Sequence, residues 1–227
     1  MNNILEVKNL SFSYMDNAGR NRIILDDVSL GFEEGKFYSI LGDSGSGKTT
    51  FLSLLAGLEY PDSGKILYKG YDIKDIGYSE FRKKYMSIVF QDYNLIKYLT
   101  VYDNIVTAMK IADRKVHREE VLGFLKILGI DEEMAFKKVT RLSGGEQQRV
   151  AIARAVAVNS KIILADEPTG NLDHNTSMEI FDLFKRLVKE YDKTVIMVTH
   201  NEKLAMMCDK VLYMDQNIRK LVNYECS

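Results

Sequence analysis

Between residues 42 and 49 the chain reads Gly42-Asp43-Ser44-Gly45-Ser46-Gly47-Lys48-Thr49, which fits the pattern G-x-x-x-x-G-K-[ST]. Such a loop lets backbone N–H groups surround phosphate oxygens at the start of a helix. An apolar stretch at residues 37–41 and a leucine-rich segment at residues 50–58 predict the strand and the helix that the loop requires. We therefore expect a nucleoside triphosphate site, with Lys48 on the β- and γ-phosphates and the Thr49 hydroxyl on magnesium.

Length and composition restrict the class of protein. The chain has 227 residues, 46% of them apolar, which is enough for a full core. Its net charge of −1 gives no basic surface for nucleic acid, so we expect no nucleic-acid partner. The N-terminus lacks the basic segment followed by an apolar one that marks a leader peptide, and no apolar run reaches the roughly 18 residues of a membrane span. We therefore expect a soluble, non-secreted chain. Cys208 and Cys226 lack C-x-x-C spacing, which argues against zinc and suits a reducing cytoplasm.

The order of the predicted elements indicates an α/β protein with a helical insert. From about residue 93 to residue 159 the pattern is mostly helical, and residues 116–128 have a broad apolar face. We expect a single domain over residues 1–227, with a core lobe from residues 1–92 and 160–227 and a helical lobe from residues 93–159. Strands are expected at residues 5–7, 23–30, 37–41, 65–68, 87–90, 162–165, 194–199 and 210–214.

Two of the expected buried strands end in chemically useful side chains. The strand at residues 162–165 leads into Asp166 and Glu167. Alone, such an ending is more often a solvated turn, but after a phosphate loop it predicts Asp166 near magnesium and Glu167 accepting a proton from attacking water. The strand at residues 194–199 leads into His200, which could donate to a γ-phosphate oxygen, although a single histidine at a strand end is usually structural.

A second helix start also has the features of an anion site. It reads Leu142-Ser143-Gly144-Gly145-Glu146, and Ser143 with Glu146 forms a capping box that opens many helices that bind nothing. Capping does not explain the glycine pair, since each glycine costs about 1 kcal/mol relative to alanine in a helix. Glycines there let backbone N–H groups approach an anion. The sequence therefore predicts two phosphate-binding helix starts for one nucleotide.

With these motifs in this order, the chain resembles the nucleotide-binding subunits of ABC transporters over nearly its whole length. The resemblance implies the ABC ATPase fold: a P-loop NTPase (RecA-like) core, an N-terminal antiparallel β subdomain and an inserted α-helical subdomain. It implies ATP and Mg²⁺ as cofactors. It also implies a head-to-tail dimer of two copies, in which each nucleotide lies between the phosphate loop of one copy and the signature segment, residues 142–146, of the other.

Residue roles follow from the same resemblance. Glu167, His200 and Gln91 correspond to the catalytic carboxylate, the switch histidine and the Q-loop glutamine, and Asp173 belongs to the D-loop. Gln91 is also an implied metal ligand, beside two that we expect from the phosphate loop and the strand end, Thr49 and Asp166. Nucleotide contacts are implied for Gly42, Asp43, Ser44, Gly45, Ser46, Gly47, Lys48, Thr49 and Thr50.

Tyr14 falls where the family places an aromatic ring that stacks on adenine, and Phe12 is the competing candidate. Two positions depart from the pattern of the branch described next. Asp43 stands where a proline is common, and Gln216-Asn217 replaces a glycine turn after the last strand.

The stretch at residues 164–173 resembles the branch that serves lipoprotein release, macrolide export, cell-division signalling and bacitracin-type peptide resistance. Such subunits act with a separate integral membrane permease, so we expect the chain at the cytoplasmic face of the membrane. There it would couple ATP hydrolysis to export, extraction or sensing of a peptide, lipoprotein or drug. The alternative is a non-transport ABC ATPase in DNA repair or translation, which the absence of long heptads, paired cysteines and a second cassette disfavours.

Residues 93–102 contain an aromatic and aliphatic cluster that we expect to dock the permease. For any one of its members, packing within the helical lobe is an equally good explanation. The cluster consists of Tyr93, Leu95, Ile96, Tyr98, Leu99 and Tyr102.

Overall fold

Two β-sheets form the centre of the molecule. The computed structural model describes residues 3–15, 19–215 and 219–224, so Gln216-Asn217 and Cys226 lie outside the described residues. An antiparallel sheet has the order β2 (Asn21–Glu33), β1 (Asn3–Met15), β4 (Ser63–Tyr68) and β5 (Tyr71–Asp72). A six-stranded sheet has the order β10 (Lys220–Asn223), β9 (Lys210–Asp215), β3 (Phe37–Leu41), β8 (Thr194–Val198), β7 (Ile162–Asp166) and β6 (Met86–Val89). Its strands β6 to β9 and β3 run parallel, and β10 is an antiparallel edge.

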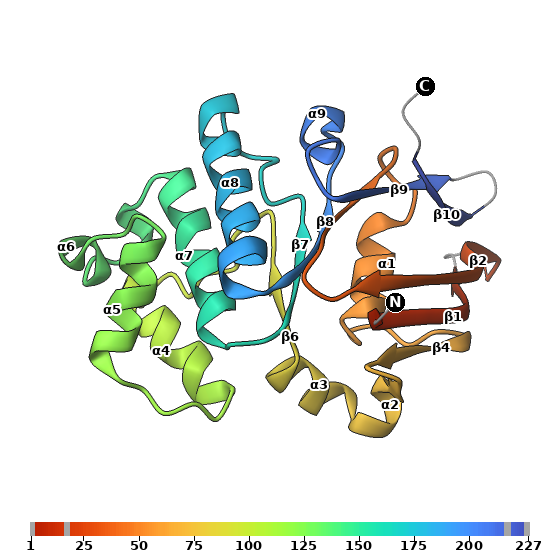
Figure 1. The fold of residues 1–227 in the computed structure, drawn as a ribbon, viewed down its shortest axis with the longest axis horizontal. Coiled ribbons are helices and arrows are strands. Elements are labelled where there is room, and N and C mark those ends of the chain that lie inside the picture. The colour runs from red at the N-terminus through yellow and green to blue at the C-terminus, as the bar shows by residue number, and fades with distance from the viewer. Residues whose placement is uncertain (1–2, 16–18, 216–218, 225–227) are drawn as a thin grey trace.

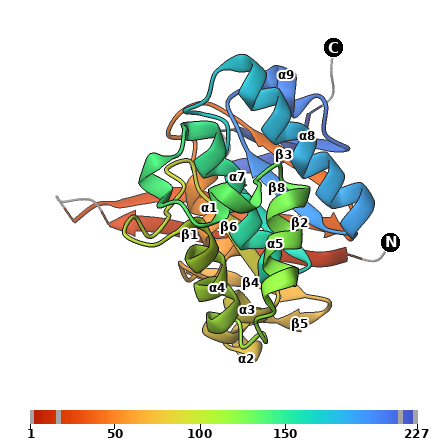
Figure 2. The ribbon, with the colours of Figure 1, turned by 90° about the vertical axis from the view of Figure 1, so that its left-hand side faces the viewer.

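The helices divide between the two sides of the six-stranded sheet. One side carries α1 (Lys48–Leu55), beside the antiparallel sheet, and α1 packs on β7 and β8. Figure 1 shows the helical region on the opposite side, and Figure 2 looks onto it. The helices there are α4 (Val101–Ile111), α5 (Arg118–Ile127), α6 (Glu132–Ala135), α7 (Gly144–Ala157) and α8 (His174–Tyr191). Short helices complete the fold: α2 (Ile73–Ile76), α3 (Tyr78–Lys84), a 3₁₀ turn at Val139–Arg141 and α9 (Glu202–Ala205).

Alternation along the buried strands explains why both faces of this sheet are covered. In β7, Ile163 and Ala165 join the core under α7 and α8, whereas Ile162 and Leu164 join the core under α1 and the antiparallel sheet. Successive side chains of a strand point to opposite faces, so a continuous apolar run requires cover on both. The helical region shares its core with one sheet face, and the lobe boundaries at residues 93 and 159 stay a prediction.

The eight expected strand segments fall within or beside strands of the structure, but their limits differ. The first strand runs from Asn3 to Met15 and is far longer than residues 5–7, because register shifts interrupt the alternation of apolar and polar positions. The first helix begins at Lys48, so Lys48 and Thr49 belong to it. The long helix α8, the short helices α2 and α3, and strands β5 and β10 were not predicted. No helix among the described residues is both long enough and apolar enough to cross a membrane.

Candidate functional site

The phosphate loop is held against strand β2. Gly47 has a φ of 105°, and a Cβ there would lie 2.6 Å from the Ile24 Cγ2 atom, so only glycine suits this position. Lys48 follows at the start of α1 and is buried. Its Nζ donates to the carbonyl oxygens of Gly42, at 2.8 Å, and Asp43, at 2.7 Å. Burial lowers the pKa of Lys48, and nearby carboxylates oppose that shift. The ammonium is therefore held within the phosphate loop by the loop's own carbonyl oxygens.

The end of β7 brings a carboxylate to the phosphate loop. The Thr49 hydroxyl donates to Asp166 Oδ1 at 3.1 Å, and burial raises the pKa of Asp166. The described residues contain no group of three or more histidine, cysteine or acidic side chains that could hold a metal. A hydroxyl beside one carboxylate nevertheless fits Mg²⁺, which usually takes one or two protein oxygens and completes its shell with water and phosphate.

Glu167 and His200 lie at the ends of adjacent strands and contact each other. His200 Nδ1 is 3.1 Å from Glu167 Oε2, and the His200 side chain is 64% exposed. Glu167 has a φ of 44°, and its backbone N–H donates to the Val198 carbonyl. The Glu167 side chain lines the same cleft as residues of the phosphate loop. An imidazole beside a carboxylate can fix its orientation.

Glu167, but not His200, lines a cleft of about 340 Å³ that extends from the phosphate loop to strands β1 and β2. Tyr14 lines it and is 41% exposed, whereas Phe12 is 5% exposed and belongs to the core. Arg22 also lines it and is a residue that sequence reasoning missed, because only the β1–β2 register places it there. The lining residues are Tyr14, Arg22, Ile24, Ser44, Gly45, Gly47, Lys48, Thr49, Thr50 and Glu167.

Gln91 and Asp173 lie in loops, do not line this cleft, and have different partners. The Gln91 amide donates to Asn171 Oδ1 at 3.1 Å, so its side chain contacts the segment just before Asp173. Asp173 caps α8 by accepting the backbone N–H groups of Asn175 and Thr176, and the Thr176 hydrogen bonds lower its pKa. The structure brings Thr49 and Asp166 together, and the inclusion of Gln91 in a metal site stays a prediction.

The signature segment opens α7 with the capping box that its sequence predicts. Ser143 Oγ accepts the Glu146 N–H, and Glu146 Oε2 accepts the Ser143 N–H at 2.7 Å. A Cβ on Gly144 would lie 2.9 Å from the Tyr93 hydroxyl, so glycine permits close packing here. Among the described residues, those that line the phosphate-loop cleft include none from residues 142–146.

A groove of about 600 Å³ lies between the Gln91 loop and the signature segment. Tyr93 and Asn94 have left-handed backbones, and Arg154 donates to the carbonyl oxygens of both. Tyr98 is 76% exposed beyond this groove. The groove is lined by Asp92, Tyr93, Asn94, Leu95, Lys97, Val139, Thr140 and Gln147.

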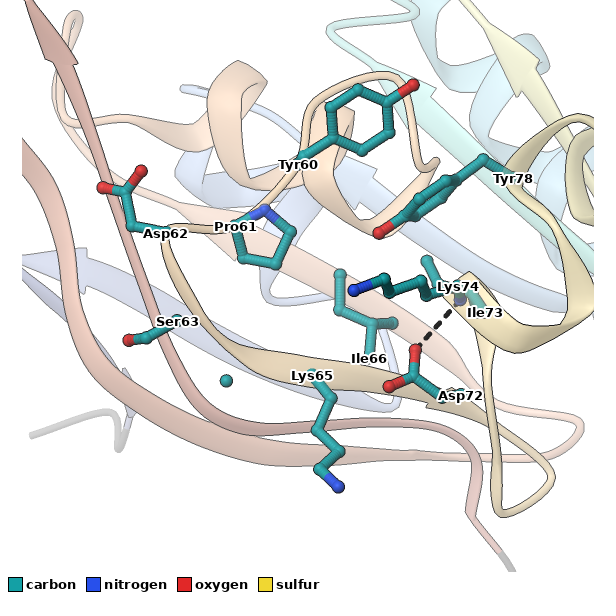
Figure 3. A pocket seen from close by; sticks show the side chains of 11 residues that line it. Tyr60, Pro61, Asp62, Ser63, Lys65, Ile66, Asp72, Ile73, Lys74 and Tyr78 are labelled. Carbon is teal, nitrogen blue, oxygen red and sulfur yellow. Dashed lines mark hydrogen bonds between the residues drawn. The ribbon is translucent and has the colours of Figure 1, made fainter.

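A further hollow of about 450 Å³ lies beside β4 (Figure 3) and includes none of the predicted site residues. Tyr60 and Tyr78 form one wall, with ring centroids 4.7 Å apart. Its carboxylates already have partners: Asp62 accepts the Ser13 hydroxyl, and Asp72 accepts the Lys74 N–H. This hollow therefore stands apart from the chemistry at the phosphate loop.

The family model for ABC transporters matches residues 25–170. The chain belongs to this family. It is 47% identical over 208 residues to the ABC transporter ATP-binding protein YclH of Bacillus subtilis, with 91% of each chain covered. It is 40% identical over 212 residues to the lipoprotein-releasing system ATP-binding protein LolD of Rickettsia felis, covering 92% of this chain and 94% of LolD. The LolD match is consistent with the lipoprotein-release branch.

Solved structures agree with this assignment. The dimeric ABC transporter cassette MJ0796 of Methanocaldococcus jannaschii superposes with a TM-score of 0.85 at 34% identity, covering 98% of this chain and 100% of that chain. A dimer of MJ0796 in a post-hydrolysis state, bound to ADP and Pi, superposes with a TM-score of 0.84 at 35% identity and the same coverage. The predicted ABC ATPase fold is therefore confirmed. The chain is the ATP-binding and ATP-hydrolysing subunit of an ABC transporter, rather than an ATPase of DNA repair or translation.

Proposed function

We propose that two copies of this ABC subunit form two composite ATP sites, each made by the phosphate loop of one copy and the signature segment of the other. One observation carries the proposal: the chain has two helix starts suited to anions, yet residues 142–146 do not line the described phosphate-loop cleft. A second copy would supply the missing half. The solved dimers of MJ0796, one of them bound to ADP and Pi, support this arrangement.

Within each site, the side chains divide the work of hydrolysis. Lys48 would exchange its two carbonyl partners for β- and γ-phosphate oxygens. Glu167 would accept the proton of the attacking water, and His200 would orient Glu167 and donate to a γ-phosphate oxygen. Signature N–H groups of the second copy would then stabilise the negative charge of the γ-phosphate.

Magnesium fits beside these groups. The Thr49 hydroxyl and the Asp166 carboxylate would hold it, with Gln91 as the third ligand that the family implies. When bound, the ion would neutralise part of the charge on the β- and γ-phosphates.

The groove beside residues 93–97 supports docking of a permease next to the signature segment. A permease helix seated there would contact Tyr93, whose hydroxyl lies against Gly144. A movement of that permease helix would therefore be transmitted through Tyr93 to the signature segment of the composite site. We place the subunit at the cytoplasmic face of the membrane through this contact, serving export, extraction or sensing of a peptide, lipoprotein or drug.

Complementation between two inactive variants tests the composite site. Lys48→Ala removes the phosphate-loop cation and leaves the signature intact, whereas Ser143→Arg blocks the signature and leaves the phosphate loop intact. Each variant alone is expected to lack ATPase activity. A mixed dimer regains one complete site, formed by the phosphate loop of the Ser143→Arg chain and the signature of the Lys48→Ala chain, so mixing should restore activity.

The mixing ratio provides the control. Activity should be greatest near equal amounts of the two variants and should vanish when either is omitted. A mixture that stays inactive while both proteins remain folded would contradict the composite site, as would substantial activity of the Ser143→Arg variant alone.

A further inference from the structure

Arg22 and Tyr14 share one wall of the nucleotide cleft. The two residues stand directly opposite each other in the β1–β2 ladder. Residues opposite each other in an antiparallel pair point to the same face, with Cβ atoms about 4.5–5.5 Å apart. Both side chains line the cleft of about 340 Å³ that contains the phosphate loop. The Arg22 guanidinium is thus a neighbour of the ring proposed to stack on adenine.

The position of Arg22 along β2 places it toward the base end of the cleft. Ile24 lines the same cleft and lies against Gly47 of the phosphate loop. Residues two apart in a strand share a face and are separated by roughly 7 Å. Arg22 is two residues from Ile24 along β2 and stands opposite Tyr14, so it lies on the Tyr14 side of the cleft.

The guanidinium is free to bind a ligand. Arg22 is exposed, and within the described part of the chain it has no hydrogen bond or ion pair. The one carboxylate among the described residues that line this cleft, Glu167, contacts His200. Arginine has five N–H donors and no acceptor, so its complement is an anion or a group rich in acceptors.

We propose that Arg22 is a nucleotide-binding residue of this chain, which donates to acceptor atoms on the α-phosphate, ribose or base of the nucleotide held against Tyr14. The inference rests on the proposed nucleotide site. Lys48 holds the β- and γ-phosphates, so the Arg22 contact is common to ATP and ADP. Loss of Arg22 therefore weakens both nucleotides by the same factor.

Equilibrium titration of ATP and ADP, each with magnesium, tests this contact in wild type and three variants. Arg22→Ala should raise both dissociation constants about tenfold, the size of one hydrogen bond to a charged group. Arg22→Lys should recover only part of the loss, because an ammonium lacks the planar fork. Arg186→Ala, on the exposed face of α8 and outside the cleft lining, removes the same charge and should stay within twofold of wild type.

A second series of titrations, at about 50 and 300 mM salt, separates a direct Arg22–nucleotide contact from a long-range electrostatic attraction. The screening length falls from more than about 10 Å at the lower salt to roughly 5 Å at the higher, so only the long-range attraction should weaken strongly. Most of the tenfold loss should persist at the higher salt. Unchanged affinity in Arg22→Ala would overturn the contact. So would a loss that disappears at high salt, is much larger for ATP than for ADP, and is fully restored by lysine.

Lys48→Ala separates failure of this inference from failure of the nucleotide site. If Lys48→Ala binds ATP like wild type, the proposed site is itself wrong. If Lys48→Ala loses ATP binding and Arg22→Ala binds ATP as tightly as wild type, only the assignment of Arg22 fails. Thermal unfolding of each variant shows that it is folded, and Arg22→Ala should match wild type because the exposed side chain has no hydrogen bond or ion pair among the described residues.

Discussion

The rings of Phe12 and Tyr14 meet edge to face, with their centroids 4.8 Å apart. Both belong to β1, but Phe12 is packed in the core and Tyr14 faces the cleft beside the phosphate loop. Phe12 thus supports the ring that a base could stack on, without being accessible to the base itself. The two aromatic candidates for adenine binding differ in accessibility, and this difference can be measured.

We expect Tyr14→Ala to weaken ATP binding about tenfold, because base–aromatic stacking contributes roughly 1–3 kcal/mol. The thermal midpoint should change little, since Tyr14 is 41% exposed. Phe12→Ala should instead lower the free energy of unfolding by about 3–5 kcal/mol. Nucleotide titration and urea unfolding check the two effects. Full ATP affinity in Tyr14→Ala, with a loss in folded Phe12→Ala, would transfer the role to Phe12.

Docking can be separated from catalysis at Tyr98. Tyr98 is 76% exposed, so Tyr98→Ala should leave the fold and the ATPase activity of the isolated subunit near wild type. Co-purification with the permease from membranes should fall. Tyr71→Ala is a matched control, since Tyr71 is 72% exposed in β5, within the other sheet.

Leu99→Ala provides a second docking variant, although Leu99 is half-buried and its carbonyl accepts the Val139 N–H. Its stability must therefore be compared with that of Tyr98→Ala. Normal transport by both variants would place the docking surface elsewhere.

Lys193 predicts a pH dependence of stability. Burial lowers its pKa from 10.5 to about 8, although its Nζ donates to the Ser160 carbonyl at 2.7 Å. Between these two values the unfolded chain keeps the proton and the folded chain releases it, so the contribution of Lys193 to stability rises with pH through this window. Relative to Lys193→Met, wild type should gain roughly 1–3 kcal/mol of unfolding free energy between about pH 8 and 10.

Urea denaturation of the two proteins at several pH values gives this difference. The titration of buried tyrosines such as Tyr38 and Tyr68, whose pKa values burial raises, is common to both proteins and cancels. Parallel pH profiles for wild type and Lys193→Met would show that Lys193 titrates normally.

The parts of the site that lie next to one another in sequence could be predicted from sequence. Lys48 and Thr49 were found from the G-x-x-x-x-G-K-[ST] pattern, although they begin helix α1, and Ser143 and Glu146 form the expected capping box because capping is local. The position of Asp166 and Glu167 at the end of a strand was predictable, because the continuous apolar run of a buried strand stops where the strand ends.

Contacts between segments that are distant in sequence were harder to predict. The register of β1 and β2 contains several shifts, so nothing in the sequence indicates that Arg22 faces Tyr14. The Gln91 side chain contacts Asn171, 80 positions along the chain, although the family resemblance names it only as a metal ligand and catalytic group. The limits of β1 were missed for a related reason, since bulges disturb the alternation that would reveal a long strand.

Glu167→Gln separates nucleotide binding from hydrolysis. The amide keeps the size of the side chain and can still hydrogen-bond His200, which lies 3.1 Å from Glu167 Oε2 in the wild type. It cannot accept the proton of water, and general-base assistance typically contributes about 10²–10⁴-fold in rate. The variant should bind ATP with magnesium and hydrolyse it at least about a hundredfold more slowly, as measured by phosphate release. Substantial remaining ATPase activity would remove Glu167 from the role of base.

The same variant should also dimerise with ATP. Without nucleotide, each composite site would join two positive helix ends with no anion between them, so the wild type should be largely monomeric. In Glu167→Gln the triphosphate persists, and the loss of one carboxylate relieves repulsion beside it. Sedimentation velocity at micromolar protein should show a dimer with ATP and magnesium and a monomer without them. Adding Ser143→Arg should abolish the dimer and spare ATP binding, because the phosphate loop is intact and only the opposing helix start is blocked. A Glu167→Gln protein that stays monomeric at saturating ATP would mean that the two helix starts do not meet across one nucleotide.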